Sequence, residues 1–187
     1  MIPEEKIIKR CLKGDRRAQK ELYSRYKNAF FMLVQRYAAH REEAQDYLQD
    51  GFIKIFRDLD QYDQRKGSFY TWGRMVMVNT ALQHIRKRRI LIADSQVEDH
   101  QETFSTNADA FEDLKTQDLY RLISELPVGY RAVFNMYAIE GYSHKEIADL
   151  LDITESTSKS QLYKAKKALQ KKLEGLAYEE SVKYESK

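Results

Sequence analysis

The residues best suited to bind a ligand lie between Leu126 and Leu173, where lysine, serine and glutamine recur within a short segment. The outward positions after Thr154 are Lys159, Ser160, Gln161, Lys164, Lys166 and Lys167. Cationic and amide side chains donate hydrogen bonds to phosphate oxygens and to the edges of purine bases. This set of side chains therefore predicts binding to duplex DNA.

Two helices joined by a tight turn would position these side chains. Ser143 and Glu146 match a capping box, and apolar residues follow at helical spacing over 147–151. The pattern breaks at 152–154, where Thr154 can cap a second helix. That helix has an apolar inner face of Leu162, Ala165 and Leu169. The arrangement predicts a helix-turn-helix whose second helix lies in a DNA major groove.

A second stretch, residues 69–89, combines aromatic, amide and cationic side chains. Trp72, Met75, Asn79 and Arg86 recur at steps of three, four and seven residues, so parts of one helix face carry all three types. Such mixtures bind single-stranded DNA, because aromatic rings stack on bases while cations hold phosphates. The alternative is a buried aromatic cluster beside a solvated basic helix end, and the pattern alone leaves both possibilities open.

Composition favours a helical protein with an uneven charge distribution. The 187 residues suit one large or two small domains, and seven glycines and two prolines are few enough to favour helices. The formal charge is only +3, yet residues 84–89 and 159–172 are basic, while 94–118 hold eight acidic residues and one lysine. Separate basic blocks predict more than one nucleic-acid contact.

The spacing of apolar residues predicts an all-α fold. Apolar side chains recur every three or four positions over 18–37, where Asp15 caps the helix, and again over 42–59. A polar loop at 62–68 precedes a helix over 69–88 that Ser68 opens. After Pro127 we expect a short buried face of Tyr130, Val133, Phe134, Tyr137 and Ile139.

Periodicity is lost between the two helical parts, which predicts two helical domains joined by a flexible acidic linker. The expected boundaries are a first domain at 1–92, a linker at 93–111, a second domain at 112–175 and a frayed C-terminal tail at 176–187. The linker is either a plain solvated tether or a segment that mimics nucleic acid.

Other classes of protein are disfavoured by what the sequence lacks. Cys11 is the single cysteine and the four histidines are scattered, so we expect no disulfide, metal or cofactor. No phosphate-binding glycine loop or nucleophile–base pair is recognisable, so we expect no enzyme activity. No apolar run approaches the roughly 20 residues of a spanning helix, and the charged residues at 4–6 do not resemble a signal peptide. We therefore expect a soluble, cytoplasmic protein.

Several motifs in order resemble the sigma-70 family of RNA polymerase sigma factors, and specifically its extracytoplasmic-function (ECF) group, which has only the second and fourth sigma domains. Residues 43–56 resemble the helix that binds core polymerase, and 69–81 resemble the segment that reads the −10 promoter element. Residues 126–131, 140–148 and 157–162 resemble the helix-turn-helix that reads the −35 element.

The resemblance implies a promoter-specificity subunit whose partners are core RNA polymerase, promoter DNA and an anti-sigma factor. The positions it implies for polymerase binding are Asp46, Gln49, Asp50 and Ile53. Those it implies for the melted −10 element are Ser68, Trp72, Arg74, Asn79, Gln83, Arg86, Arg88 and Arg89. Those it implies for the −35 duplex are Lys159, Ser160, Gln161, Tyr163 and Lys164.

Three positions and one alternative function remain open at this level. Trp72 either packs in the core or contacts DNA. Ser156 replaces a usual glycine and predicts a shifted helix start, while Ser158 replaces a usual apolar residue and predicts looser packing. The alternative function is a stand-alone helix-turn-helix regulator whose N-terminal helices dimerise or sense a ligand, although it leaves the motifs at 43–83 unexplained.

Overall fold

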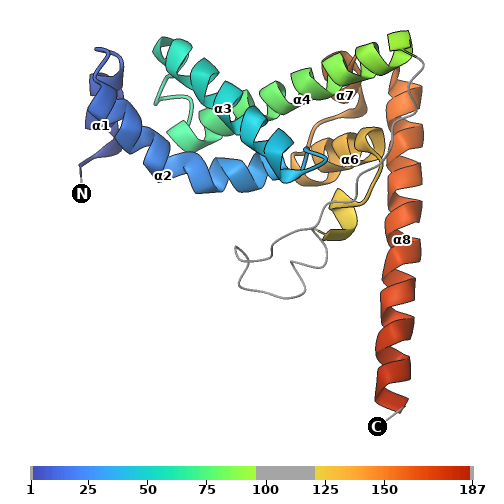
Figure 1. Cartoon of the computed structure of the whole chain (residues 1–187). Coiled ribbons are helices and arrows are strands. Elements are labelled where there is room, and N and C mark those ends of the chain that lie inside the picture. Colours follow the sequence, from blue (N-terminus) through green and yellow to red (C-terminus); the bar gives the residue numbers. More distant parts are fainter. Residues whose placement is uncertain (1, 96–120, 186–187) are drawn as a thin grey trace. The chain divides into compact units, whose positions relative to one another are not determined.

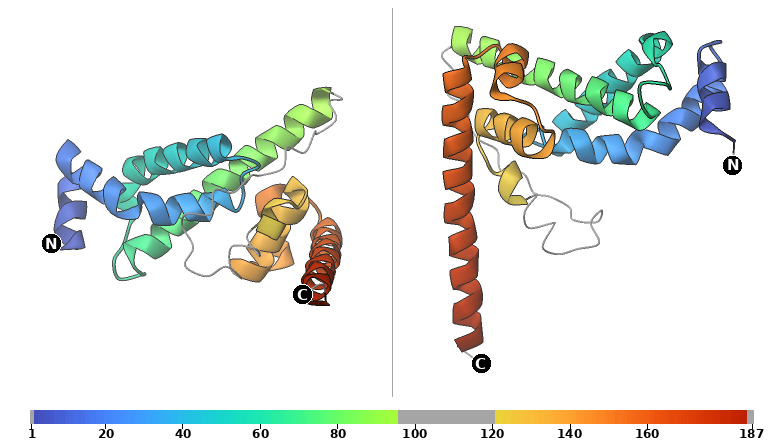
Figure 2. Two further views of the ribbon diagram at one scale, coloured as in Figure 1. Left: turned by 60° about the horizontal axis from the view of Figure 1, so that its bottom comes forward. Right: turned by 180° about the vertical axis from the view of Figure 1, so that it is seen from behind.

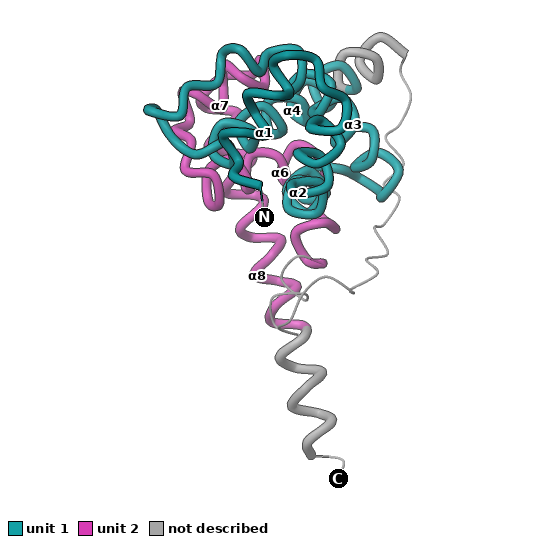
Figure 3. Tube along the Cα trace, turned by 90° about the vertical axis from the view of Figure 1, so that its left-hand side faces the viewer, with its two compact units in different colours: residues 1–97 teal, residues 98–187 magenta. Residues whose placement is uncertain are grey.

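The chain forms two compact units, residues 1–97 and 98–187 (Figures 1 and 3). Every secondary-structure element assigned in the described residues is a helix. A computed structural model describes the backbone of residues 2–95 and 121–185, and the side chains of residues 2–88 and 121–175. The predicted all-α fold with two helical domains is confirmed.

The first unit packs four helices around one core: α1 (Glu4–Cys11), α2 (Arg16–Gln35), α3 (Arg41–Arg57) and α4 (Phe69–Ser95). Helix α2 contacts the other three, and α3 packs against α4, which it crosses at an angle (Figure 2). Aromatic rings fill the centre, where Phe30 and Phe69 are fully buried and the ring of Tyr26 lies 5.0 Å from that of Phe69. A 3-10 turn, Leu59–Gln61, follows α3.

The helix starts of this unit follow from short polar side chains. The Asp15 carboxylate accepts hydrogen bonds from the backbone N–H groups of Arg17 and Ala18, at 2.9 and 3.2 Å. The Ser68 hydroxyl likewise accepts from the N–H of Thr71 at 3.2 Å. These caps satisfy donors that have no partner within the helix. Both predicted helix starts are confirmed.

Two glycines inside helices allow α4 to approach its neighbours closely. A Cβ on Gly73 would lie 2.6 Å from the ring of Phe30 in α2, and one on Gly51 would lie 2.2 Å from the sulfur of Met77 in α4. Both distances are shorter than real Cβ contacts, so the Phe30 ring or the Met77 side chain would have to move to admit a methyl group. Glycine is a poor helix former, so close packing explains its presence at these positions.

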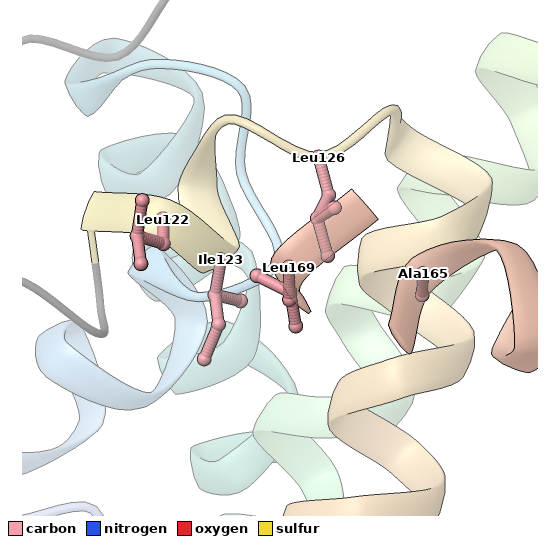
Figure 4. Close-up of a cluster of buried hydrophobic side chains, with 5 residues drawn as sticks. All are labelled: Leu122, Ile123, Leu126, Ala165 and Leu169. Carbon is pink, nitrogen blue, oxygen red and sulfur yellow. The ribbon is translucent and has the colours of Figure 1, made fainter. Parts of the chain in front are cut away.

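The second unit is built on three labelled helices: α6 (Val128–Phe134), α7 (His144–Leu151) and α8 (Glu155–Glu185). Residues 121–124 are also helical, and their apolar side chains pack on α8. The buried cluster shown in Figure 4 comprises Leu122, Ile123, Leu126, Ala165 and Leu169. It binds the long α8 to the preceding part of the unit and leaves the opposite face of α8 exposed.

Helices α7 and α8 form the predicted helix-turn-helix. The Ser143 hydroxyl accepts a hydrogen bond from the Glu146 N–H, and the Glu146 carboxylate accepts one from the Ser143 N–H at 2.8 Å, which completes the capping box. Asp152 ends α7 in the left-handed conformation with φ 54°. The Thr154 hydroxyl then accepts from the Thr157 N–H at 3.0 Å and caps α8.

One predicted buried face is partly wrong. Tyr137 is 41% exposed and Ile139 is 36% exposed, although both were expected in the core. The reason is a π-helical turn at Asn135–Ile139, which widens the helix and changes which residues face inward. Met136 and Asn135 are buried in their place.

Two helices extend further than the sequence indicates. Helix α4 continues to Ser95, past the expected start of the linker, and the remainder of that linker, 96–111, lies outside the described residues. The backbone of α8 is helical through Glu185, where the sequence predicted a frayed tail. Among the described residues, no helix combines the length and apolar character that crossing a membrane requires.

Candidate nucleic-acid and polymerase interfaces

Helix α8 separates its apolar and polar residues onto opposite faces. Leu162 and Ala165 are buried, whereas Ser160 is exposed and Tyr163 is 66% exposed. Lys159 is also exposed, with its ammonium 3.6 Å from the Glu155 carboxylate. An ion pair this exposed is weak and can be exchanged for a ligand contact. The central part of the predicted −35 set is therefore available to a duplex.

Gln161 and Lys164 lie at the sides of the outward face of α8 and contact residues of α6. The Gln161 amide is half-buried and lies against Gly129 of α6, where an added Cβ would be 3.3 Å away. The Lys164 ammonium lies 6.0 Å from the centroid of the Tyr130 ring. Of the five predicted −35 residues, Gln161 thus faces outward least, and Lys164 is held beside an aromatic ring.

Ser158 is buried beneath α8 and replaces apolar packing with a hydrogen bond. Its side chain is 0% exposed, and its hydroxyl lies 2.9 Å from Nδ1 of His144, the first residue of α7. The His144 ring in turn stacks on Tyr137, with centroids 4.6 Å apart. Instead of the expected loosening, this position links both helices of the helix-turn-helix to the π-helical turn.

The first part of the predicted −10 site lies in the loop before α4 and in its first turns. Trp72 is partly exposed and packs against Tyr62 and Phe69, with ring centroids 5.7 and 5.9 Å apart. The Tyr62 hydroxyl donates to the backbone oxygen of Gly67 at 3.2 Å, which fixes the loop. Because Trp72 is both packed and partly exposed, a DNA contact at this residue stays a prediction.

The next turns of α4 carry the remaining candidate base and phosphate contacts. Met75 is 50% exposed and Arg86 is exposed, whereas Arg74 and Asn79 are half-buried. The side-chain oxygen of Asn79 is buried without a hydrogen-bond partner among the described residues. The side chain of Arg89 lies outside the described residues.

Three predicted site residues lie on a polar boundary between α3 and α4. Gln83 accepts a hydrogen bond from Lys54 at 2.7 Å, and Asp50 lies 2.8 Å from Nε2 of His84. The Arg88 guanidinium lies 3.6 Å from the Glu43 carboxylate. The sequence placed Asp50 with the polymerase contacts and the two α4 residues with DNA, but the fold brings all three to one boundary.

The polymerase-binding candidates divide between two sides of α3. Gln49 and Ile53 border a groove of about 700 Å³ between α2 and α3, and Ile53 is 57% exposed. Asp46 is exposed but does not line this groove. A groove bordered by exposed apolar side chains is a candidate surface for binding a partner.

Helix α2 contributes residues to this groove that sequence reasoning missed. The groove is also lined by Tyr23, Lys27, Asn28 and Phe31 of α2 and by Arg41, the first residue of α3, and its lining includes no acidic residue. The Arg41 guanidinium lies 5.2 Å from the centroid of the Phe31 ring. Tyr23 directly follows the buried Leu22 and so lies outside the apolar stripe, and an aromatic residue off that stripe was the available signal. Within the described residues, no cluster of His, Cys, Asp or Glu could hold a metal ion.

Comparison with known proteins identifies this combination of elements. The model of Sigma-70 region 2 matches residues 22–90, which span α2 to α4, and the model of Sigma-70 region 4 matches residues 116–169, which include the helix-turn-helix. The two matches together account for well over half of the chain. The chain therefore belongs to the sigma-70 family of RNA polymerase sigma factors.

Its relatives place it in the ECF group. It is 27% identical to an RNA polymerase sigma-H factor of Pseudomonas aeruginosa, over 94% of this chain and 96% of the relative. It is 27% identical to an ECF sigma-E factor of Haemophilus influenzae (94% and 97%) and 26% identical to that of Escherichia coli (94% and 96%). The fold is similar to the sigma factor RpoE, solved with the anti-sigma factor NepR from Bartonella quintana, with a TM-score of 0.55, 19% identity and coverage of 83% and 96%.

Proposed function

We propose that this chain directs core RNA polymerase to promoters by binding the −35 duplex with α8, the melted −10 element with residues 62–89, and the polymerase with α3. The observation that carries the proposal is the division of α8 into two faces. Leu162 and Ala165 are buried while Ser160 and Tyr163 point away from the core. A helix of this kind after a capped turn is suited to the major groove.

At the −35 element, Lys159, Ser160 and Tyr163 supply the base and backbone contacts. Lysine and hydroxyl groups pair with purine edges and phosphates, and each good base contact discriminates by roughly 1–3 kcal/mol. Lys164 contributes from the flank. Gln161 has a smaller share because its amide lies against Gly129.

At the −10 element, the loop 62–68 and the first turns of α4 hold the melted strand. Flipping a base out of a duplex costs a few kcal/mol, which stacking and polar contacts must offset. Trp72 and Met75 offer apolar surface, and the buried oxygen of Asn79 offers an unused acceptor. Arg74 and Arg86 supply positive charge for phosphates, which positions the strand without specifying its sequence.

Core polymerase binds the exposed side of α3. Ile53 and Gln49 provide an apolar and a polar side chain at the groove, and Asp46 adds an exposed charge on α3 outside the groove, at the rim of the proposed interface. Rim charges of this kind orient a partner and raise the association rate. Lys27 of α2 and Arg41 of α3 make the groove cationic, so the polymerase segment seated there carries acidic and apolar side chains.

The chain acts in the cytoplasm with the polymerase and has no catalytic activity of its own. An anti-sigma factor controls it by covering the polymerase- and DNA-facing surfaces. Support for this regulation comes from the solved relative, which was crystallised with the anti-sigma factor NepR.

A run-off transcription assay tests the proposal. Core polymerase from a compatible bacterium is given the chain and a pool of promoter fragments from the same genome. We expect specific starts that fall at least about tenfold with Lys159→Ala combined with Tyr163→Ala, because two base contacts are lost. The control is Lys13→Ala, which removes an exposed lysine from the turn between α1 and α2 and should leave the starts unchanged.

Two results would overturn the proposal. One is the absence of specific starts together with tight, polymerase-independent binding of the chain to duplex DNA at paired half-sites. That result indicates a stand-alone helix-turn-helix regulator. The other is specific initiation that survives the double substitution, which would remove α8 from promoter recognition.

A further inference from the structure

Helix α8 carries a cationic stripe that extends beyond the residues proposed to read the −35 element. Lys164, Lys167 and Lys171 recur at steps of three and four residues, so they share one helix face, and all three are exposed. With Tyr130 of α6 they border an open groove of about 510 Å³. The groove is completed by Ala168, Gln170 and Glu174.

The charge in this groove favours an anionic ligand. Three ammonium groups face a single carboxylate, that of Glu174, which accepts a hydrogen bond from Gln170 at 3.0 Å. The Tyr130 ring lies beside the Lys164 ammonium and limits the directions in which that side chain can point. The groove thus combines surplus positive charge with one partly fixed cation.

The row of lysines is long enough to reach more than one phosphate group. Seven residues of helix separate Lys164 from Lys171, a rise of about 10 Å. The stripe is also continuous with the −35 surface, because Lys164 directly follows the exposed Tyr163.

We infer that this groove binds the sugar–phosphate backbone of DNA that flanks the −35 element, with Lys167 and Lys171 each contacting a phosphate. The inference rests on the proposed function, in which α8 enters the major groove. Phosphate contacts of this kind set the depth and register of the recognition helix without reading sequence. Glu174 opposes the binding because its carboxylate repels the same phosphates.

The test uses the polymerase holoenzyme reconstituted with the full chain and a promoter fragment identified by run-off transcription. The binding constant K of the holoenzyme for this fragment is measured at several KCl concentrations. Lys171→Ala should weaken binding several-fold and reduce the slope of log K against log [KCl] by about 1, since one phosphate contact is lost. Glu174→Gln should strengthen binding, which is the opposite sign and is not expected of a structural role. Thermal melting checks that each variant folds.

The matched control is Lys172→Ala, one residue further along the same helix. The Lys172 ammonium bonds Glu125 and does not line the groove. This variant carries the same change in charge but should leave the salt slope unaltered.

Each remaining outcome decides against the inference. If the wild-type holoenzyme initiates specifically but Lys171→Ala and Glu174→Gln change neither affinity nor slope, the groove does not bind phosphate and the proposed function stands. If transcription falls with Lys171→Ala while the salt slope is unchanged, the groove binds an acidic protein surface instead. If the wild-type chain supports no specific initiation, the proposed function fails and this inference fails with it.

Discussion

At the scale of single residues, the protein places polar groups in its interior where they connect helices. Ser158 is 0% exposed and its hydroxyl lies 2.9 Å from His144 Nδ1. A buried hydroxyl is tolerated when it has a partner and is costly when it does not. The bond therefore ties α7 to α8 at the point from which the recognition helix extends.

Ser158→Ala should destabilise the second unit by about 1 kcal/mol relative to Ser156→Ala, because His144 loses its partner. Ser156 lies on the exposed side of α8, so Ser156→Ala is a control that makes the same change in helix propensity without removing a buried hydrogen bond. In a urea titration, the far-ultraviolet circular dichroism signal monitors the unfolding of both units. The fluorescence of Trp72, the single tryptophan, monitors the unfolding of the first unit alone. We expect a shift only in the circular dichroism signal, and equal midpoints for the two variants would contradict the prediction.

Cys11 should be nearly inert in the native protein. Burial, reinforced by the nearby Asp15 carboxylate, raises the pKa of the Cys11 thiol to about 11. The thiolate is the reactive form, so labelling by a disulfide reagent at pH 8 should be at least about 100-fold slower than in urea. Because the folded pKa lies above the unfolded value, the neutral thiol favours folding below pH ~8.5, and this contribution is lost as the pH rises towards 11. Fast labelling of native protein would show that α1 opens readily.

At the scale of elements, close helix contacts and capped helix starts give the functional surfaces their geometry. Gly73 and Gly51 let α4, which carries candidate DNA-binding residues, lie against α2 and α3, which line the candidate polymerase groove. The caps at Ser143 and Thr154 fix where α7 and α8 begin.

Gly73→Ala should destabilise the first unit by about 1–3 kcal/mol, because the new methyl group collides with the buried Phe30 ring. The control is Gly175→Ala in α8, where nothing lies within 4 Å of the added carbon. That change should stabilise its helix by up to about 1 kcal/mol. Urea midpoints from circular dichroism compare the two, and a stable Gly73→Ala protein would show that the helices separate easily.

The capping box of α7 should make the second unit sensitive to acid. Hydrogen bonds from the Ser143 side chain, and then from its backbone N–H, hold the pKa of Glu146 below its usual value. Because the folded pKa is depressed, the stabilisation is present above the unfolded value of about 4.3 and is lost as the pH falls through the folded value. Glu146→Gln keeps a capping side chain without the titration. The stability difference between wild type and this variant should be constant from pH 7 to 5 and shrink below pH 4, as followed by urea unfolding.

At the scale of the whole molecule, two separately folded units carry different surfaces. The first unit exposes Ile53 beside the α2–α3 groove, and the second exposes Tyr163 on α8. Each unit has its own buried core. Polymerase binding and −35 recognition should therefore be separable by mutation.

Ile53→Glu should reduce co-purification with core polymerase at least about tenfold, because a charge replaces the exposed apolar centre of the interface. Tyr163→Ala should leave polymerase binding unchanged and lower transcription from promoters that depend on the −35 element, by roughly 5–100-fold. Both side chains are exposed, so the fold of each variant should be retained. Loss of polymerase binding by Tyr163→Ala would mean that the two surfaces are not separate.

The sequence by itself determined the helical elements and several of their starts, but not where α4 and α8 end. Capping residues such as Asp15, Ser143 and Thr154, and apolar side chains at helical spacing, act through neighbours in the chain, so their effect is visible without the fold. The same local patterns predicted which face of α8 is buried. They also carried enough family-specific order to indicate a sigma factor.

Only the tertiary structure decided what depends on contacts between distant residues. The π-helical turn exposes Tyr137, the α2 side of the groove is completed by Tyr23, and Asp50 faces His84 across the boundary between α3 and α4. The partner of Ser158 was equally hidden, because it lies 14 residues away on another helix. Such pairings arise from packing between helices, and no local spacing rule encodes which side chain a neighbouring helix will present.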